Sequence, residues 1–152
     1  MELILWRHAE AEEAEPDVSR KLTGKGQKQA AKMARWLDSN LPETCRILVS
    51  PAVRAQETVA YLQRKFKTVP ELGTGASIQD VLNAANWPNS REPVLIVGHQ
   101  PYLGLVAAQL LGTPQQECAI RKGNVWWITQ KPREDELQTY LKAIMSPDLV
   151  VK

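Results

Sequence analysis

The segment Leu3-Ile4-Leu5-Trp6-Arg7-His8 decides how this chain folds, because a short apolar run passes directly into two polar side chains. Val94-Leu95-Ile96-Val97-Gly98-His99 repeats this arrangement later in the chain. Short runs of branched apolar residues are typical of buried strands. Two further runs of this kind are Ile47–Val49 and Val125–Ile128. The sequence therefore predicts four buried strands, and the chain's only two histidines follow two of them.

Longer segments with a helical period lie between these runs. After Thr23, which is expected to cap a helix, apolar residues recur at helical spacing until the segment closes at 40–42. A second helix is expected to have Ser50 as its cap and to continue to Phe66, which places Arg54 in its first turn. Two shorter helices are predicted around 78–85 and 103–110, and a last strand at Leu137–Met145. The alternation favours an α/β fold, a three-layer α/β/α sandwich with a mostly parallel central sheet.

The composition narrows the class of protein. With 43% hydrophobic and 24% charged residues, the chain resembles globular proteins and is predicted to form one domain over residues 1–152. The net charge of +2, with scattered basic residues, does not indicate a nucleic acid partner. No run approaches the ~18 apolar residues of a membrane span, and Met1-Glu2 leads into the first strand without a leader-like segment. We therefore expect a cytoplasmic protein that makes no membrane contact.

Cys45 and Cys118 are the two cysteines of the chain, and we expect both to be reduced and structural. The sequence contains no CxxC pair and no histidine pair, so it offers no ligand spacing for a structural zinc site. We expect the protein to work without a metal or another cofactor.

Four side chains of two kinds are expected to meet at one edge of the sheet. In open α/β sheets, ligands bind beyond the carboxyl ends of the strands, often at helix N-termini. Arg7 and His8 follow the first strand, Arg54 follows the second, and His99 follows a later one. Guanidinium groups bind phosphate oxygens bidentately and stay charged at any working pH. Two arginines and two histidines at this edge predict a phosphate pocket.

The two histidines add chemistry that arginine does not supply. A neutral imidazole is nucleophilic at one nitrogen when a backbone carbonyl group fixes its other N–H. One ring can then accept a phosphoryl group, while the second donates a hydrogen bond to the transferring oxygens. Taken singly, each motif has a simpler interpretation as surface decoration, a turn or a solvated helix residue. Their joint occurrence at strand ends favours a catalytic site, and this scheme requires no metal.

These motifs resemble those of the histidine phosphatase superfamily, formerly grouped with the phosphoglycerate mutases. The family pattern is an Arg-His pair after the first strand, Ser-Pro-x-x-Arg-Ala-x-x-Thr after the second, and Gly-His-x-Pro later. Here the three motifs appear as Arg7-His8, Ser50–Thr58 and Gly98–Pro101. The short length, Arg20-Lys21-Leu22-Thr23-x-x-Gly26 and Pro70-Glu71-Leu72 are similar to the SixA-type phosphohistidine phosphatases. The resemblance implies a phosphoglycerate mutase-like fold.

The resemblance also implies a role for each motif residue. His8 would be phosphorylated during turnover, and Arg7, Arg54 and His99 would form the rest of the phosphate pocket. Arg20 matches an arginine of the SixA-like group and would either flank the phosphate or be an ordinary surface residue.

The proton donor for the leaving group is left open by this comparison. Many family members that cleave phosphate esters present an acidic residue, whereas SixA-like enzymes have no evident equivalent. Asp17 and Glu71 are the candidates here, with Glu10 as a third. Ala9 also departs from the commonest family pattern, in which glycine follows the histidine, but SixA-like chains have glycine or alanine there.

The chemistry of the leaving group favours a phosphoprotein substrate. Phosphohistidine has a better leaving group than an alkyl phosphate, so a dedicated carboxylic acid is dispensable. The chain also lacks the long insertions that build a lid, which suggests a site open to a protein side chain. We therefore expect a metal-independent phosphatase of phosphohistidine or another phosphoprotein, acting through a covalent intermediate on His8.

Signal transduction is the expected context, with a phosphorylated protein such as a histidine phosphotransfer domain as the partner of a monomeric enzyme. Two alternatives remain. One is a phosphatase of small phosphomonoesters, which a raised carboxyl pKa near His8 would support. The other is a phosphate-binding interaction module that never turns over, although arginines alone would serve a binder.

Overall fold

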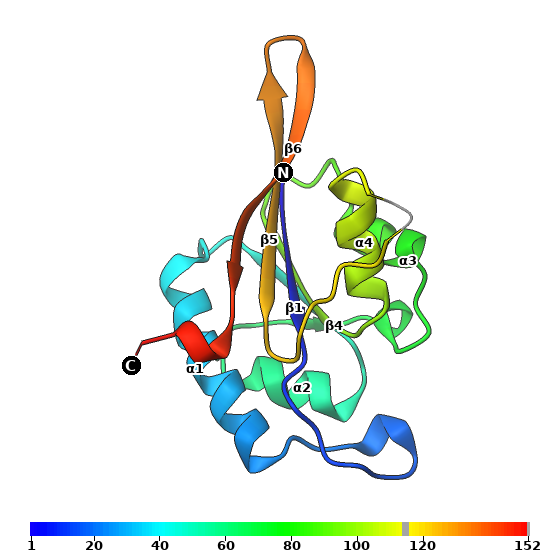
Figure 1. Cartoon of the computed structure of the whole chain (residues 1–152), viewed down its shortest axis with the longest axis vertical. Helices are drawn as coiled ribbons and strands as arrows, with labels where there is room; N and C mark the ends of the chain where they lie inside the picture. Colours follow the sequence, from blue (N-terminus) through cyan, green and yellow to red (C-terminus); the bar gives the residue numbers. More distant parts are fainter. Residues whose placement is uncertain (114–115, 152) are drawn as a thin grey trace.

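A six-stranded sheet forms the middle of the structure, a computed structural model that describes residues 1–113 and 116–151 (Figure 1). The strand order is β3-β2-β4-β1-β5-β6. The parallel strands are β1 (Glu2–Arg7), β2 (Arg46–Val49), β3 (Lys67–Thr68) and β4 (Val94–Gly98). The antiparallel strands are β5 (Val125–Arg133) and β6 (Glu136–Met145). The predicted parallel sheet is therefore present, with an antiparallel pair added next to β1.

Helices cover both faces of this sheet. They are α1 (Gly24–Asn40), α2 (Val53–Ala60), α3 (Ile78–Ala85) and α4 (Tyr102–Leu110). Along β1, Leu3 and Leu5 pack with residues of α3 and α4, whereas Ile4 and Trp6 pack with residues of α1 and α2. Figure 1 shows α3 and α4 on one side of the sheet and α1 on the other. The three-layer α/β/α sandwich expected from the sequence is confirmed.

The second helix differs from its prediction at both ends. Its N-cap is Ala52 rather than Ser50, and α2 ends well before Phe66, which is 40% exposed. The chain leaves the helical direction through a turn in which Gln63 has a left-handed φ of 56°. The Ser50 hydroxyl accepts a hydrogen bond from the Ala52 backbone N–H and contacts the His99 ring. Ser50, which was predicted to cap the helix, instead lies at the edge of the sheet next to His99.

The β5 strand is longer than predicted. The prediction covered Val125–Ile128, but pairing with β6 continues from Val125–Met145 to Arg133–Glu136, with a register shift after Trp127. The polar residues of its second half carry no strand pattern, because this part of β5 forms a hairpin that projects beyond the helices (Figure 1). The predicted last strand is confirmed as β6.

The carboxyl ends of three neighbouring strands meet at one edge of the sheet. Arg7 of β1 pairs with Gly98 of β4, and Val49 of β2 pairs with Val97 of β4. The segments that follow these strands therefore leave the sheet side by side, at the edge where α/β sheets bind ligands. Short 3-10 helices lie at Asp17–Ser19 (η1), Pro70–Leu72 (η2) and Pro147–Leu149 (η3).

Three further findings concern the chain as a whole. Among the described residues, no helix combines the length and the apolar character that crossing a bilayer requires.

Both cysteines are free thiols, and burial raises the pKa of the Cys45 thiol to about 11, which keeps it protonated at neutral pH. In the same part of the chain, no three or more His, Cys, Asp or Glu side chains gather as metal ligands.

Candidate active site

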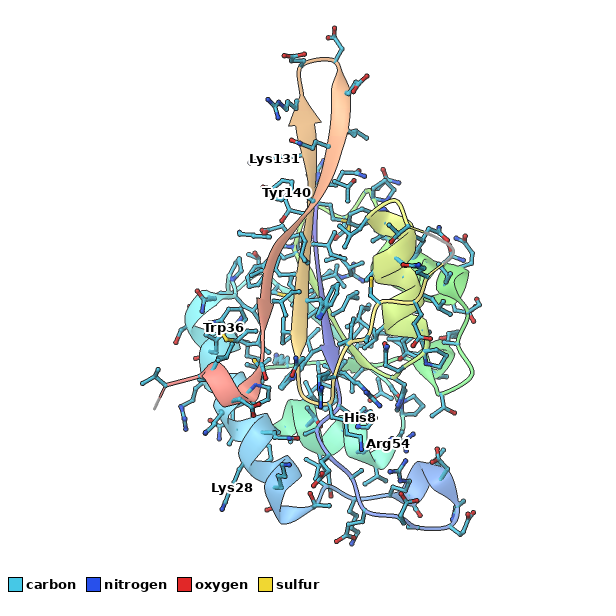
Figure 2. The ribbon with its side chains drawn as sticks, in the orientation of Figure 1. His8, Lys28, Trp36, Arg54, Lys131 and Tyr140 are labelled. Carbon is cyan, nitrogen blue, oxygen red and sulfur yellow. The ribbon has the colours of Figure 1, made fainter. Side chains whose placement is uncertain are left out.

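The His8 imidazole lies directly beyond β1 and is held in one orientation. Its Nδ1 lies 2.7 Å from the carbonyl oxygen of Ala9, so this nitrogen carries the ring proton and donates it. The Nε group of Arg54, also a donor, lies 3.4 Å from His8 Nε2, which fits a lone pair on that nitrogen. His8 thus presents an unprotonated Nε2 beside Arg54, and Figure 2 shows the two side chains together at this end of the sheet.

Arg54 lies in the first turn of α2, as the sequence predicts, and its side chain is 5% exposed. Its Nη1 donates to the backbone carbonyl oxygen of Asp17 at 2.9 Å, and its Nη2 donates to the Asp17 carboxylate at 3.1 Å. One turn later, the Thr58 hydroxyl donates to the Arg54 carbonyl oxygen and accepts from the Ala9 backbone N–H. These contacts tie the start of α2 to the segment that follows β1.

A hydroxyl group orients the ring of His99 at the end of β4. The His99 Nε2 lies 2.7 Å from Ser50 Oγ. Ser50 Oγ also accepts from the backbone N–H of Ala52, and we assign its own proton to the hydrogen bond with His99 Nε2. The ring proton of His99 then resides on Nδ1, a buried atom without a hydrogen-bond partner in the part of the chain that the structure describes. The centroids of the His99 and His8 rings are 5.2 Å apart.

Arg7, the last residue of β1, provides a second guanidinium group. Its Nη1 donates to the carbonyl oxygen of Ile120 at 3.1 Å, whereas its buried Nε has no partner within residues 1–113 and 116–151. An unpaired buried polar group costs about 1–3 kcal/mol. Arg7 Nε and His99 Nδ1 are thus two buried donors without a hydrogen-bond partner among the described residues. An anion that accepts hydrogen bonds from both would remove this cost.

Burial keeps both imidazoles neutral. Desolvation is the main reason that the pKa of His8 falls to about 3, opposed by the hydrogen bond to Ala9 and reinforced by His99, Arg54 and Arg7. Desolvation, followed by the positive charge of Arg54, lowers the pKa of His99 to about 4. Both rings are therefore uncharged at neutral pH, and only a neutral imidazole has a nucleophilic nitrogen.

Asp17, the first candidate proton donor, is engaged with two arginines. Its carboxylate lies 3.1 Å from Arg54 Nη2 and 3.4 Å from Arg20 Nη1. The hydrogen bond from Arg54, with a smaller effect of Arg20, holds the pKa of Asp17 below its usual range. The carboxyl group is therefore ionised at neutral pH, and it holds no proton to donate while it is paired with the arginines. Arg20 is connected to Arg54 through Asp17, and its Nε donates to the carbonyl oxygen of Glu12.

The other acidic candidates make no contact with the four motif residues among the hydrogen bonds and ion pairs of the described chain. Glu71 is exposed in η2, where the next residue's carbonyl oxygen accepts from the Tyr102 hydroxyl at 2.7 Å. The Tyr102 ring packs edge-on against His99, with centroids 5.9 Å apart. Glu10 accepts a hydrogen bond from the Thr23 hydroxyl at 2.8 Å.

Asp17 is carried by a finger formed by residues 11–22, between β1 and α1. An isolated antiparallel bridge joins Ala11 to Leu22 at its base. Two backbone hydrogen bonds of 2.7 and 3.0 Å lie next to this bridge and close the base further. The finger contacts the site where Asp17 accepts hydrogen bonds from Arg54. His8, next to Arg54, is only 5% exposed.

Sequence reasoning missed the supporting roles of Ser50, Thr58 and Tyr102. Ser50 and Thr58 stand at fixed places in the second motif, so the motif spacing was a signal, but it did not reveal their hydrogen-bond partners. The Tyr102 side chain packs so close to the backbone of Gly98 that a Cβ at this position would overlap the Tyr102 hydroxyl group. This contact explains why a glycine precedes His99.

Comparison with known proteins supports the reading of these motifs. A protein from Haemophilus influenzae, named phosphohistidine phosphatase SixA homolog, is 36% identical over 129 residues that cover 74% of this chain and 78% of that protein. The chain belongs to the histidine phosphatase superfamily. The model of branch 1 of this superfamily matches residues 3–75, which include His8 and Arg54. His99 lies outside the matched range.

Within the histidine phosphatase superfamily, the chain is of the SixA type. Phosphohistidine phosphatase SixA of Escherichia coli is 31% identical over 120 residues, covering 72% of this chain and 74% of that protein. A solved structure described as the protein histidine phosphatase SixA complexed with tungstate is 25% identical and superposes with a TM-score of 0.75. That superposition covers 97% of this chain and 98% of the other, so the two histidine phosphatases share their whole fold.

Proposed function

We propose that the protein is a metal-independent phosphatase that removes the phosphoryl group from phosphohistidine in a protein. The observation that carries this proposal is the neutral Nε2 of His8, which the Ala9 carbonyl group orients and which Arg54 faces. The names of the two relatives, both phosphohistidine phosphatases, support the same substrate. Tungstate is a tetrahedral oxyanion like phosphate, so its complex with a SixA relative supports oxyanion binding in this fold.

In the first step, His8 Nε2 attacks the phosphorus atom of the substrate. A P–N bond forms to His8 as the P–N bond of the substrate breaks, and the electron pair of the broken bond stays on the leaving nitrogen. A substrate ring that is protonated on its other nitrogen leaves as neutral imidazole, while His8 keeps its Nδ1 proton. Arg7 and Arg54 neutralise the phosphoryl oxygens, and His99 Nδ1–H donates to them.

In the second step, water attacks the phosphorus atom of phosphorylated His8. The P–N bond breaks, its electron pair returns to Nε2, and both protons of the water molecule leave with the product as dihydrogen phosphate. His8 regains the neutral state in which it began. Neither step requires a carboxylic acid, which agrees with the ionised state of Asp17 in its pair with Arg54.

We further propose that the enzyme acts as a cytoplasmic monomer whose residues 1–152 form one domain without a lid insertion. Its substrate would be a signalling protein, such as a phosphorylated histidine phosphotransfer domain. A small alkyl phosphate is a weaker candidate, because its alkoxide leaving group needs a proton that Asp17 does not hold.

Labelled phosphohistidine protein tests the proposal directly. Wild-type enzyme is quenched during turnover, and the label on the enzyme is exposed to acid and to alkali. We expect an adduct that acid removes and alkali leaves intact, because this is the stability of a P–N bond. Phosphate affinity without an adduct or turnover would favour the interaction module, and faster turnover of an alkyl phosphate would favour the small-ester phosphatase.

A further inference from the structure

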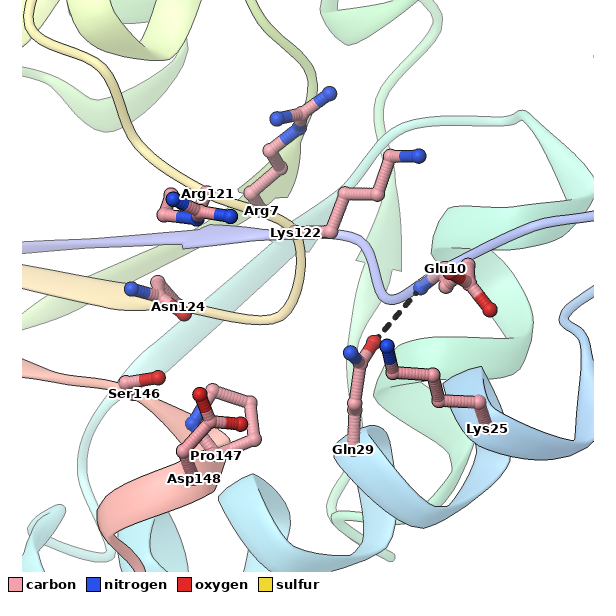
Figure 3. A pocket seen from close by; sticks show the side chains of 10 residues that line it. All are labelled: Arg7, Glu10, Lys25, Gln29, Arg121, Lys122, Asn124, Ser146, Pro147 and Asp148. Carbon is pink, nitrogen blue, oxygen red and sulfur yellow. Dashed lines mark hydrogen bonds between the residues drawn. The ribbon is translucent and has the colours of Figure 1, made fainter.

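A pocket of about 460 Å³ opens beside the catalytic edge, with Arg7 in its wall (Figure 3). Its other walls come from the first turns of α1, from the turn that precedes β5, and from η3. These segments are far apart in the sequence. Of the four motif residues, only Arg7 lines the pocket, and His8, Arg54 and His99 do not.

The pocket carries an excess of positive charge. Arg7, Lys25, Arg121 and Lys122 line it together with two carboxylates. Within residues 1–113 and 116–151, none of these four cations forms an ion pair. Lys25 also lies in the first turn of α1, where the helix dipole disfavours a positive side chain. The phosphoryl group accounts for Arg7, whereas Lys25, Arg121 and Lys122 are available for a second anionic group.

The basic turn is joined to the backbone of the catalytic strand. The N–H of Gly123 points at two carbonyl oxygens, those of Arg7 at 3.1 Å and His8 at 3.0 Å. The indole N–H of Trp6 donates to the Gly123 carbonyl oxygen at 3.1 Å. Gly123 has a φ of 77°, and a Cβ there would press on Pro147 of η3. The turn that carries Arg121 and Lys122 is therefore fixed against the backbone of His8.

We propose that this pocket binds carboxylate side chains that flank the phosphohistidine of the substrate protein. The proposal rests on the phosphohistidine phosphatase function proposed above, and it specifies which substrate surfaces the enzyme accepts. The finger adds to this selectivity, because Glu12 and Glu15 are exposed on it and repel an acidic flank. An acidic flank is thereby directed to the pocket beside Arg7.

A carboxylate ligand fits the pocket better than a nucleic acid does. No aromatic residue of the described chain lines the pocket, so bases would find no surface on which to stack. Glu10 and Asp148 also line the pocket, and their negative charges disfavour a continuous phosphodiester backbone. Separate carboxylates can instead pair with individual cations.

Two matched peptides test the proposal. Both carry one phosphohistidine, and they differ only in having three glutamates or three glutamines beside it. We expect the wild-type KM to be on the order of tenfold lower for the glutamate peptide at low salt, with similar kcat, and the preference to shrink as salt is added. Phosphoramidate ion, which has no flank, serves as the small substrate.

The double variant Arg121→Glu/Lys122→Glu should abolish or reverse the preference while leaving turnover of phosphoramidate unchanged. The matched control is Arg91→Glu/Arg133→Glu, which makes the same change of charge at exposed sites outside the pocket. The control should retain the wild-type preference. A loss on phosphoramidate equal to the loss on the peptides would mean that the catalytic site was damaged, and it would overturn the proposal.

The outcomes separate this proposal from the proposed function. If both peptides are hydrolysed with the same KM, the phosphatase stands and the pocket proposal fails. If neither peptide is hydrolysed, the proposed function fails, and the pocket is judged by fluorescence anisotropy of the two labelled peptides. Equal affinities, or a double variant that loses affinity for an oligonucleotide and not for the glutamate peptide, would overturn the proposal.

Discussion

The ends of β1 and β4 present the same residue type in two different hydrogen-bonding states. At the end of β1, a backbone carbonyl group holds the Nδ1 proton of His8 and leaves Nε2 with its lone pair. At the end of β4, the Ser50 hydroxyl bonds to Nε2 of His99 and leaves the proton on Nδ1. Both rings are neutral, so charge does not distinguish them. The neighbour of each ring therefore selects the tautomer and hence the chemistry.

The two strand ends are expected to differ most in turnover and in adduct formation when the ring of His8 or of His99 is removed. His8→Ala should abolish both turnover and the covalent adduct, because it removes the nucleophile. His99→Ala should reduce turnover on the order of a hundredfold, the cost of one transition-state donor, and should still form the adduct. Rapid acid-free quenching of both variants with labelled phosphohistidine protein measures this. An adduct on His8→Ala would reverse the assignment of the two rings.

Protonation of the same rings should make the free energy of unfolding depend on pH. The folded-state pKa values of about 3 for His8 and about 4 for His99 lie below the unfolded value of 6.5, so the unfolded chain binds more protons between these limits. Stability should thus be full above pH 6.5 and fall by a few kcal/mol as the pH drops towards 4. Urea titrations across this range measure it, and His99→Gln should flatten the curve. An unchanged slope in that variant would contradict the burial argument.

A smaller effect is expected from the hydroxyl group that sets the His99 tautomer. Ser50→Ala should reduce kcat by about tenfold with little change in KM, because His99 loses the partner that fixes its proton on Nδ1. Ser50→Thr keeps a hydroxyl group at this place and should restore most of kcat. Steady-state kinetics of the three proteins with phosphohistidine peptide test this. A loss that threonine does not rescue would indicate a packing role.

The smallest effect is expected from Asp17 of the finger, which pairs with Arg54 next to His8. Asp17→Asn removes a negative charge that competes with phosphate for Arg54, so KM for phosphohistidine peptide should fall by at most about fivefold, the worth of a partly exposed ion pair. If Asp17 instead donates the proton to the leaving group, turnover should fall by about a hundredfold or more. A lower KM would make the variant a better enzyme, whereas a lower turnover would make it a worse one. Turnover of an alkyl phosphate by wild type and by Asp17→Asn provides the comparison, because an alkoxide leaving group needs a proton.

The sequence predicted the parts of the fold that depend on local periodicity. The apolar run Leu3–Leu5 predicted the buried strand β1, and its end placed His8 just beyond the strand. Arg54 could be assigned to the first turn of α2 because Ser50 and Pro51 mark a helix start, even though the helix begins after them.

Pairings between distant segments could not be predicted in this way. The Ser50 hydroxyl fitted a helix cap as well as a contact with His99, and the choice depends on the parallel pairing of β2 with β4. Asp17 was a candidate proton donor, but the finger brings its carboxylate to Arg54, which lowers the pKa of that carboxyl group further below neutral pH. The basic residues Arg121 and Lys122 looked scattered because their neighbour Lys25 is far away in the chain.

The closed base of the finger has a consequence for how such enzymes diversify. Since the ends of the finger are already joined by the bridge between Ala11 and Leu22, changing its length leaves the sheet undisturbed. Doubling the length of a flexible loop costs only about 0.6 kcal/mol in closure entropy. Insertions or deletions in the finger can therefore change the opening that leads to His8, and with it the range of proteins that the site accepts. The residues that carry out the reaction stay in place.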